Sequence, residues 1–276
     1  MKRTVENIKD PLYRFFERET VFGARLLGEV RTDLEDVVAI CEGSKKQSNH
    51  HRALTAALNR GMVPEQWNRY KVPAGVTVMA WVEDLAQRVA QLQKVSAAVK
   101  KEQAKGLKGL KVWLGGLFTP VMARRPLHPR VWLGGLFNPE AYITATRQLV
   151  AQANEWSLEE LQLHVLCAND FGALKADDCS FPISGLKMMG GGCEEGNQLR
   201  LSDAIFTDLA AVLLQWRRLE GGKRAKAQPN HVSLPVYRYP SRSELLFTLD
   251  FVADSPQAVS LAYERGLALI AANHLG

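Results

Sequence analysis

The stretch WLGGLFNPEAYITATRQLVAQANEWSLEEL at residues 132–161 decides the fold, because it joins an apolar, glycine-containing segment to a helix and then to a strand. Asn138 is a favourable N-cap, Pro139 suits the first helical position, and Glu140 suits the positive end of the helix dipole. Apolar residues then recur at helical spacing, so one face of this helix is buried. None of these residues has a catalytic character, and we interpret the role of this stretch as structural.

The N-terminal part of the chain predicts three helices. Apolar residues recur at intervals of three and four from residue 12 to residue 38, and this pattern ends at Gly43. A second helix is expected at about 47–59, before Gly61, and a third begins after Thr77. The apolar faces of these helices must be buried against each other or against something outside this chain.

After residue 156, short apolar segments alternate with clusters of Gly, Asn, Asp, Ser and Pro, which is typical of strands and turns. The predicted strands are 161–167, 183–189, 213–219, 232–239, 244–251 and 266–271. The predicted fold class is α+β, with an N-terminal helical cap followed by a C-terminal antiparallel β-barrel or sandwich. We divide the chain into a helical cap (1–111), a junction with an inserted loop (112–137), and a capped helix plus barrel (138–276).

The composition is that of an ordinary globular protein, with 276 residues, 46% hydrophobic and 23% charged. No apolar run approaches the roughly 20 residues needed to cross a bilayer, so no membrane partner is predicted. The four cysteines are few for this length and are expected to be reduced thiols of a cytosolic protein.

The formal net charge is +6, and residues 94–130 are strongly basic, with Glu102 as the single acid. Nucleic-acid binding is not predicted, because the lysines of KVSAAVKKEQAKGLKGLK are not interleaved with stacking aromatic residues. A solvated helix end and linker explains the charge, and a docking surface for an acidic neighbour is the alternative.

Candidate catalytic and metal-binding residues are not convincing. The glycines at 190–192 are followed by Glu194, which would repel a phosphate, and we predict a hairpin turn there. His164 and Cys167 have the spacing of metal ligands, but in a strand this spacing places them on opposite faces. We predict no catalytic residue, no metal and no cofactor.

Two further groups of polar residues have simple interpretations. His50 and His51 are expected to lie solvated on a polar helix face, and Asp177 with Asp178 in a solvated loop. No nucleophile signature accompanies them.

Seven segments of the chain resemble, in the same order, successive pieces of the C-terminal domain of dynein heavy chains in the cytoplasmic form. They are 6–19 (ENIKDPLYRFFERE), 27–43, 67–93, 132–161, 183–191 (ISGLKMMGG), 232–251 and 263–270 (YERGLALI). The residues that we assign to the structural signature are Trp132, Gly134, Gly135, Phe137, Asn138, Pro139, Gly185, Pro235, Arg265 and Gly266.

The resemblance implies a helical cap and β-barrel that lie against one face of the AAA+ ring of a minus-end-directed microtubule motor. The implied role is regulatory, structural and non-catalytic, the implied partners are ring modules and other dynein subunits, and the implied location is cytoplasmic and cytoskeleton-associated. ATP hydrolysis and microtubule binding belong to other segments of that family, so a fragment or truncated gene product is expected.

A domain taken from its ring should expose the apolar face that docks there. The residues expected on this docking face are Leu26, Val30, Leu34, Trp67 and Trp81. The alternative function is a free-standing interaction module, whose barrel holds a peptide or cytoskeletal partner without a motor.

One feature departs from the resemblance, because VWLGGLF occurs twice, at 112–118 and at 131–137. Only the second copy continues into NPEAYITATRQ, and Pro120, Pro126 and Pro129 follow the first. We predict that the second copy is integrated into the fold and that the first is an extruded loop. The duplication is either natural or an error of the gene model.

Overall fold

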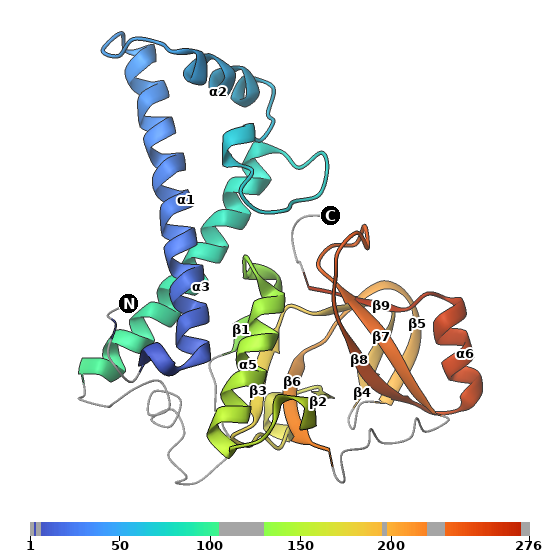
Figure 1. Cartoon of the computed structure of the whole chain (residues 1–276). Helices are drawn as coiled ribbons and strands as arrows, with labels where there is room; N and C mark the ends of the chain where they lie inside the picture. Colours follow the sequence, from blue (N-terminus) through green and yellow to red (C-terminus); the bar gives the residue numbers. More distant parts are fainter. Residues whose placement is uncertain (1–2, 4–6, 105–129, 195–197, 220–229, 272–276) are drawn as a thin grey trace.

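The computed structural model describes residue 3 and residues 7–104, 130–194, 198–219 and 230–271, with side chains omitted from 98 to 104. Helices come first along the chain and two β-sheets follow (Figure 1), so the predicted α+β class is confirmed. The first VWLGGLF copy and most of the basic block lie outside the described residues. Among the described helices, none has the length and apolarity required to cross a membrane.

Three helices form the N-terminal part, close to the predicted positions. They are α1 (Pro11–Cys41), α2 (Asn49–Asn59) and α3 (Val78–Ala104), with short 3-10 turns η1 (Asn7–Lys9) and η2 (Glu65–Trp67). Asp10 caps α1 by accepting hydrogen bonds from two backbone N–H groups, and Thr77 caps α3 through the N–H of Ala80 at 3.3 Å. Gly61 follows α2 with a φ of 69°, as expected of a glycine that ends a helix.

Helix α5 and a four-stranded sheet form the middle of the molecule. The elements are β1 (Val131–Trp132), η3 (Leu133–Gly135), α5 (Pro139–Asn154), η4 (Leu158–Glu160), β2 (Leu161–Ala168), η5 (Phe171–Ala173), β3 (Ser180–Ser184) and β6 (Ala211–Arg218). The strand order is β1-β3-β6-β2, with β1 parallel to β3 and the other pairs antiparallel. Trp216 of β6 donates from Nε1 to Thr146 of α5, which holds this helix against the sheet.

The remaining strands pair in the closed order β4-β5-β8-β7-β9. They are β4 (Lys187–Glu194), β5 (Gln198–Asp208), β7 (His231–Tyr237), β8 (Leu245–Ala253) and β9 (Ala268–Ile270), with α6 (Pro256–Glu264) between β8 and β9. The expectation of a purely antiparallel arrangement was wrong, because β5 pairs with β8 and β7 pairs with β9 in parallel. Parallel neighbours need a crossover connection, and α6 supplies one for β7 and β9.

Three details of the strand prediction are corrected. Segment 183–189 is divided between β3 and β4 at Gly185, whose φ is 76°. Strand β5 was not predicted, because its apolar and polar residues do not alternate regularly and few of its side chains are buried. The glycines at 190–192 are not a hairpin turn: they lie inside β4, where Gly190 has a φ of 73° at a bulge between Met189 and Gly191.

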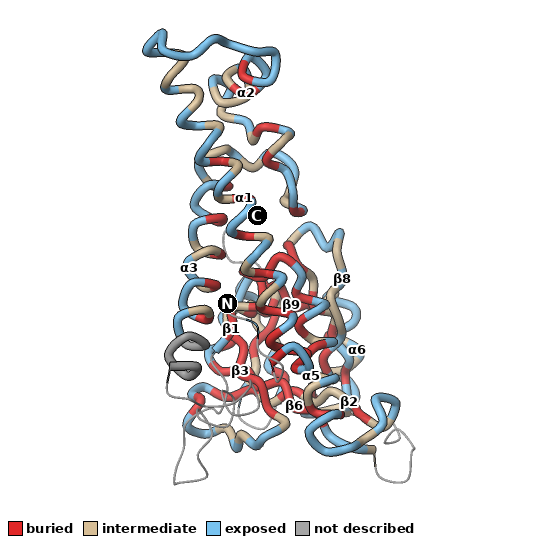
Figure 2. Tube along the Cα trace, turned by 60° about the vertical axis from the view of Figure 1, so that its left-hand side comes forward, coloured by how far each residue is buried: buried red, intermediate tan, exposed pale blue. Residues whose placement is uncertain are grey.

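Most buried apolar side chains form one cluster that runs from α1 to the last strand, and Tyr239 packs in a second, small cluster. Figure 2 shows the buried positions on the inner sides of α1 and α3 and throughout the sheets, while most of α2 and the adjoining end of α1 is exposed. Helices and strands therefore share a core, and the segment that joins them is central to it. The division of the chain at residues 111 and 137 stays a prediction.

Candidate functional site

The second VWLGGLF copy and the two residues after it form the junction segment, residues 131–139, between the helices and the strands. Its first part is held by α3: the N–H of Trp132 donates to Gln91 Oε1 at 2.7 Å, and Gln91 Nε2 donates to the carbonyl of Trp132 at 3.2 Å. Val131 pairs with Ile183 of β3. The segment is thus bonded to a helix and a sheet at once.

Position 135 must be glycine, because the surrounding atoms leave no room for a Cβ atom. A Cβ atom built there would lie 2.1 Å from Cε3 of the Trp132 ring, far closer than any van der Waals contact. The indole lies over the glycine at the tight turn of η3 and leaves no room for a side chain there. Gly134 is buried beside it.

The carboxylate of Glu19, on α1, holds the end of the junction segment. Oε2 accepts the N–H of Phe137 at 2.7 Å, and Oε1 accepts the backbone N–H and the side-chain Nδ2 of Asn138 at 3.1 and 2.9 Å. Burial raises the pKa of Glu19, and the hydrogen bonds from Asn138 and Phe137 oppose this shift.

Helix α5 starts at Pro139, as predicted, but the expected capping by Asn138 was wrong. The Asn138 side chain makes no hydrogen bond to the first turn of α5 and donates to Glu19 instead. The reason is that a buried carboxylate needs donors, and Asn138 supplies one from its backbone and one from its amide.

Arg88 of α3 holds the carbonyl side of the same peptide units. Its side chain is fully buried, Nη1 donates to the carbonyl of Leu136 at 2.8 Å, and Nε and Nη2 donate to Asp84 at 2.6 and 3.2 Å. The hydroxyl of Tyr70 donates to the same carboxylate at 2.9 Å, and the guanidinium lies 4.8 Å from the centre of the Tyr70 ring. Burial, together with the charge of Asp84, raises the pKa of Tyr70, so the phenol stays a donor.

A third charged side chain approaches from the strands. Arg238, just after β7, donates from Nη1 to the carbonyl of Phe137 at 3.2 Å, and its Nε lies 2.9 Å from Oε2 of Glu244. Side chains of α1, α3 and the barrel therefore converge on the backbone of residues 136–138. This arrangement fixes the helices and the barrel relative to one another.

Aromatic packing surrounds the junction segment. The ring of Phe137 lies 4.7 Å from that of Phe22 and 5.3 Å from that of Tyr70, and Tyr70 stacks on Trp81 at 5.7 Å. Trp67 stacks on the other side of Trp81, also at 5.7 Å. These rings form a continuous core between α1, η2 and α3.

This packing corrects the predicted docking face. Four of its five residues are buried, with exposed fractions of 2% for Leu26, 5% for Val30, 1% for Trp67 and 0% for Trp81. The apolar stripes of α1 and α3 face each other, so they are covered within this chain. Leu34 alone of the five is exposed, at 41%.

The other signature residues lie in the strand region, away from the junction segment. Gly185 turns between β3 and β4, and Pro235 pairs with Thr248 within β7 and β8. Arg265 ends α6 and contacts Asp203 at 3.4 Å; Gly266 has a φ of 61° and accepts a hydrogen bond at its carbonyl. The structure thus brings together only the signature residues of the junction segment.

Sequence reasoning missed the charged residues that hold the junction segment: Glu19, Asp84, Arg88 and Arg238. One signal was present, because Asp84 and Arg88 are spaced four apart beside Trp81 and Leu85, in an otherwise apolar stripe of α3. A charged pair in that position is typical of a buried network.

The polar residues weighed for other chemistry have structural partners. His51 is buried and takes part in the capping box of α2, so the expectation that it is solvated was wrong. His50 is exposed, as expected, and its Nε2 lies 2.8 Å from Asp33. Asp177 and Asp178 are exposed in a loop, as expected, and Asp177 also accepts hydrogen bonds from Ser180 and Gln215. The described residues contain no group of three or more His, Cys, Asp and Glu able to hold a metal.

Comparison with known proteins identifies the family. The family model for the C-terminal domain of the dynein heavy chain matches residues 1–271. The protein is similar to cytoplasmic dynein heavy chains of Drosophila melanogaster (48% identical over 100% of this chain), Caenorhabditis elegans (41% over 98%) and Dictyostelium discoideum (33% over 98%). It spans 5% of the length of each of these relatives. Together with a fold organised around the WLGGLFNPE junction, this shows that the protein belongs to the family of C-terminal domains of dynein heavy chains.

Proposed function

We propose that this chain is a non-catalytic regulatory and structural element that docks on the AAA+ ring of a cytoplasmic dynein heavy chain and tunes its ATP-driven, minus-end-directed movement. Its place in the cell is then cytoplasmic, on the cytoskeleton. The observation that carries the proposal is the convergence of Glu19, Arg88 and Arg238 on residues 136–138. A body held this rigidly can contact several ring modules at once and favour the ring conformations that fit it.

Exposed apolar side chains at and beside the start of α3 supply a docking surface in place of the buried residues first predicted. Met62, Met79 and Val82 are 56%, 75% and 37% exposed. Met79 and Val82 lie one turn apart on α3, and Met62 pairs with Thr77 at the start of that helix. We name these three residues the helical apolar patch. The relatives are about twenty times longer than this chain, so in a heavy chain other modules are present that could cover such a patch, and we propose that a ring module does so.

The experiment uses the heavy chain of a relative from which the region aligned to this chain has been removed. This chain is added in trans, and its affinity for the ring is measured in the ATP-bound, ADP-bound and nucleotide-free states. Regulation predicts that the affinity differs between states by about 5–150-fold, the usual range of allosteric coupling. Equal affinity in all states, or no binding, would contradict the proposal.

Matched variants test where the chain docks. Met79→Asp should weaken ring binding, since a charge replaces an exposed apolar contact. Thr144→Asp, on the exposed side of α5, should leave binding unchanged. Both positions are on helix surfaces, so neither variant disturbs the core.

The proposal includes the absence of catalysis by this chain. The glycines at 190–192 lie within a strand, whereas a phosphate-binding loop joins a strand to a helix. Calorimetric titration with Mg·ATP should show no binding, and micromolar affinity, about −8 kcal/mol, would contradict this.

A free-standing cytoskeletal interaction module is the second candidate, favoured by one observation on the barrel. Ile205 and Phe206 of β5 are 74% and 40% exposed, so the strand offers apolar side chains to a partner. This function predicts that Ile205→Asp abolishes partner binding and that Met79→Asp does not. Ring docking through the helical apolar patch predicts the reverse.

A further inference from the structure

Two cysteines from different sheets meet between β2 and β4. Cys167, near the end of β2, is buried and is hydrogen-bonded to the thiol of Cys193 in β4. Neither sulfur is in a disulfide. Cys193 is only partly buried, so this pair has one covered member and one that solvent reaches.

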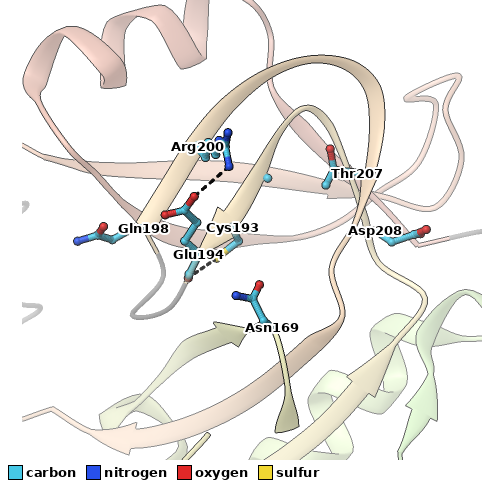
Figure 3. Close-up of a pocket in the computed structure, with 8 residues that line it drawn as sticks. Asn169, Cys193, Glu194, Gln198, Arg200, Thr207 and Asp208 are labelled. Carbon is cyan, nitrogen blue, oxygen red and sulfur yellow. Dashed lines mark hydrogen bonds and ion pairs between the residues drawn. The ribbon is translucent and has the colours of Figure 1, made fainter. Parts of the chain in front are cut away.

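The exposed side of the pair opens into a pocket of about 570 Å³. Cys193, Gly192 and Asn169 line it together, which places the residues just after β2 against β4 (Figure 3). A small oxidant therefore has access to Cys193, while Cys167 lies behind it in the core.

We propose that Cys167 and Cys193 are a reversible modification site, at which a peroxide converts the two thiols into a disulfide that joins the four-stranded sheet to the barrel. In the first step the sulfur of Cys193 attacks hydrogen peroxide, the O–O bond breaks, and a sulfenic acid and one water form. In the second step the sulfur of Cys167 attacks that of Cys193, the S–O bond breaks, and a second water leaves. The two thiols together lose two electrons and two protons, and the peroxide is reduced to two waters.

The order of the two steps follows from the surroundings of the sulfurs. The hydrogen bond to Cys193 and burial raise the pKa of the Cys167 thiol, which keeps it protonated and slow to react with an oxidant. Cys193 lines the pocket and is the sulfur that a peroxide meets first. Cys167 is in contact with it and acts as the resolving thiol.

The disulfide would add a covalent link between the two sheets, which the chain already joins where β3 leads into β4 and where β5 leads into β6. Strand β2 pairs with β6, on which α5 lies, whereas β4 pairs with β5 and β9. A covalent bond between β2 and β4 limits any movement of the barrel relative to that sheet. Thiols of the cytosolic glutathione pool would reverse the modification.

The other two cysteines are internal controls. Cys41 is exposed at the end of α1. Cys179 is partly buried, accepts a weak hydrogen bond from Asn154 at 3.8 Å, and has its pKa raised to about 11 by burial. Neither has another cysteine among its hydrogen-bond partners in the described part of the molecule.

The experiment treats the reduced full-length protein with a small excess of hydrogen peroxide, blocks remaining thiols with iodoacetamide, and maps tryptic peptides by mass spectrometry. Each cysteine falls in its own peptide: 32–45, 148–175, 176–187 and 188–200. We expect a linked pair of 148–175 with 188–200, two hydrogen masses lighter than the sum, that disappears with dithiothreitol. The oxidised protein should also melt at a higher temperature than the reduced protein, because the bond constrains the unfolded state.

Variants separate the proposed pair from general oxidation. Cys193→Ser should abolish both the linked peptide and the melting shift, while Cys41→Ser and Cys179→Ser should keep both. The proposal is overturned if peptide 188–200 carries only sulfinic acid or a glutathione adduct while 148–175 is fully alkylated. Linkage of 188–200 to 32–45 or 176–187 in the folded protein would overturn it too. The wild-type peptide map decides alone if a variant fails to fold.

Discussion

Glu19 on α1 binds both the backbone N–H and the side-chain amide of Asn138 at the start of α5, although 119 residues separate the two in the sequence. The same carboxylate accepts the N–H of Phe137. A carboxylate at a helix N-terminus is favoured by the unpaired N–H groups and by the helix dipole. Here the carboxylate comes from another helix, so the start of α5 and the position of α1 depend on one side chain.

Replacing Glu19 by Ala should strongly destabilise the fold. The change leaves the N–H groups of Phe137 and Asn138 buried without an acceptor, and each costs about 1–3 kcal/mol. Chemical denaturation measures the free energy of unfolding. Glu35→Ala, on the exposed side of the same helix, is the control and should change it by less than about 0.5 kcal/mol. Equal effects of the two variants would show that Glu19 does not hold the junction segment.

Gly135→Ala and Gly28→Ala should act in opposite directions. The first places a methyl group 2.1 Å from the Trp132 ring and should cost about 1–3 kcal/mol of stability through overpacking. The second adds a methyl group with no atom within 4 Å on helix α1 and should stabilise by about 0.5–1 kcal/mol. Thermal melts of both variants check the signs. Trp132→Leu combined with Gly135→Ala should cost less than the two single changes added together.

Stability should depend on pH through Asp10. Burial raises the pKa of this carboxyl to about 6 from 3.8, and its Oδ2 has no hydrogen-bond partner among the described residues. The folded state therefore holds the proton of Asp10 more tightly than the unfolded state does. The stabilisation that results is complete below about pH 4 and is lost as the pH rises through 6. The two-unit shift corresponds to about 3 kcal/mol.

Asp10→Asn should remove that dependence while keeping a capping oxygen for α1. Unfolding free energies from pH 4 to pH 7 should fall less for the variant than for the wild type, and the variant should be the more stable at pH 7. Curves that stay parallel across this range would show that Asp10 titrates normally.

Phe137→Ala should cost about 3–5 kcal/mol, because its ring is 4% exposed and packs on Phe22 and Tyr70. Phe206→Ala, 40% exposed on β5, offers the matched control and should cost less than about 1 kcal/mol. Denaturant titration of both variants gives the comparison. A large loss at both positions would mean that β5 is covered in solution.

Deletion of residues 113–131 should be tolerated. It joins Val112 to Trp132 and restores one VWLGGLFNPE, in which Val112 replaces the buried Val131. Each doubling of a flexible insertion costs only about 0.6 kcal/mol, so the deletion should leave the melting temperature unchanged or slightly raised. Loss of folding would show that the first copy is integrated.

The sequence allowed the helices and most strands to be predicted, because these depend on local periodicity and caps. Strand β5 and helix α6 were missed, because β5 has no regular alternation of apolar and polar residues and α6 is a short helix of nine residues. The docking face was wrong because periodicity shows which residues share a face but not what covers it. The charges around residues 136–138 come from elements far apart in the sequence, so local patterns give little sign of their meeting.

The closed strand order has a consequence for synthesis on the ribosome. Strand β4 pairs with β9 at Lys187 and Ile270, and β7 pairs with β9 at Val236 and Leu269. Until the last of these residues has left the exit tunnel, β4 and β7 each lack a neighbour, and such open edges promote association between nascent polypeptides. The helices can form their local hydrogen bonds long before that, whereas the barrel cannot close until β9 has been synthesised. The barrel therefore most needs a chaperone during this delay.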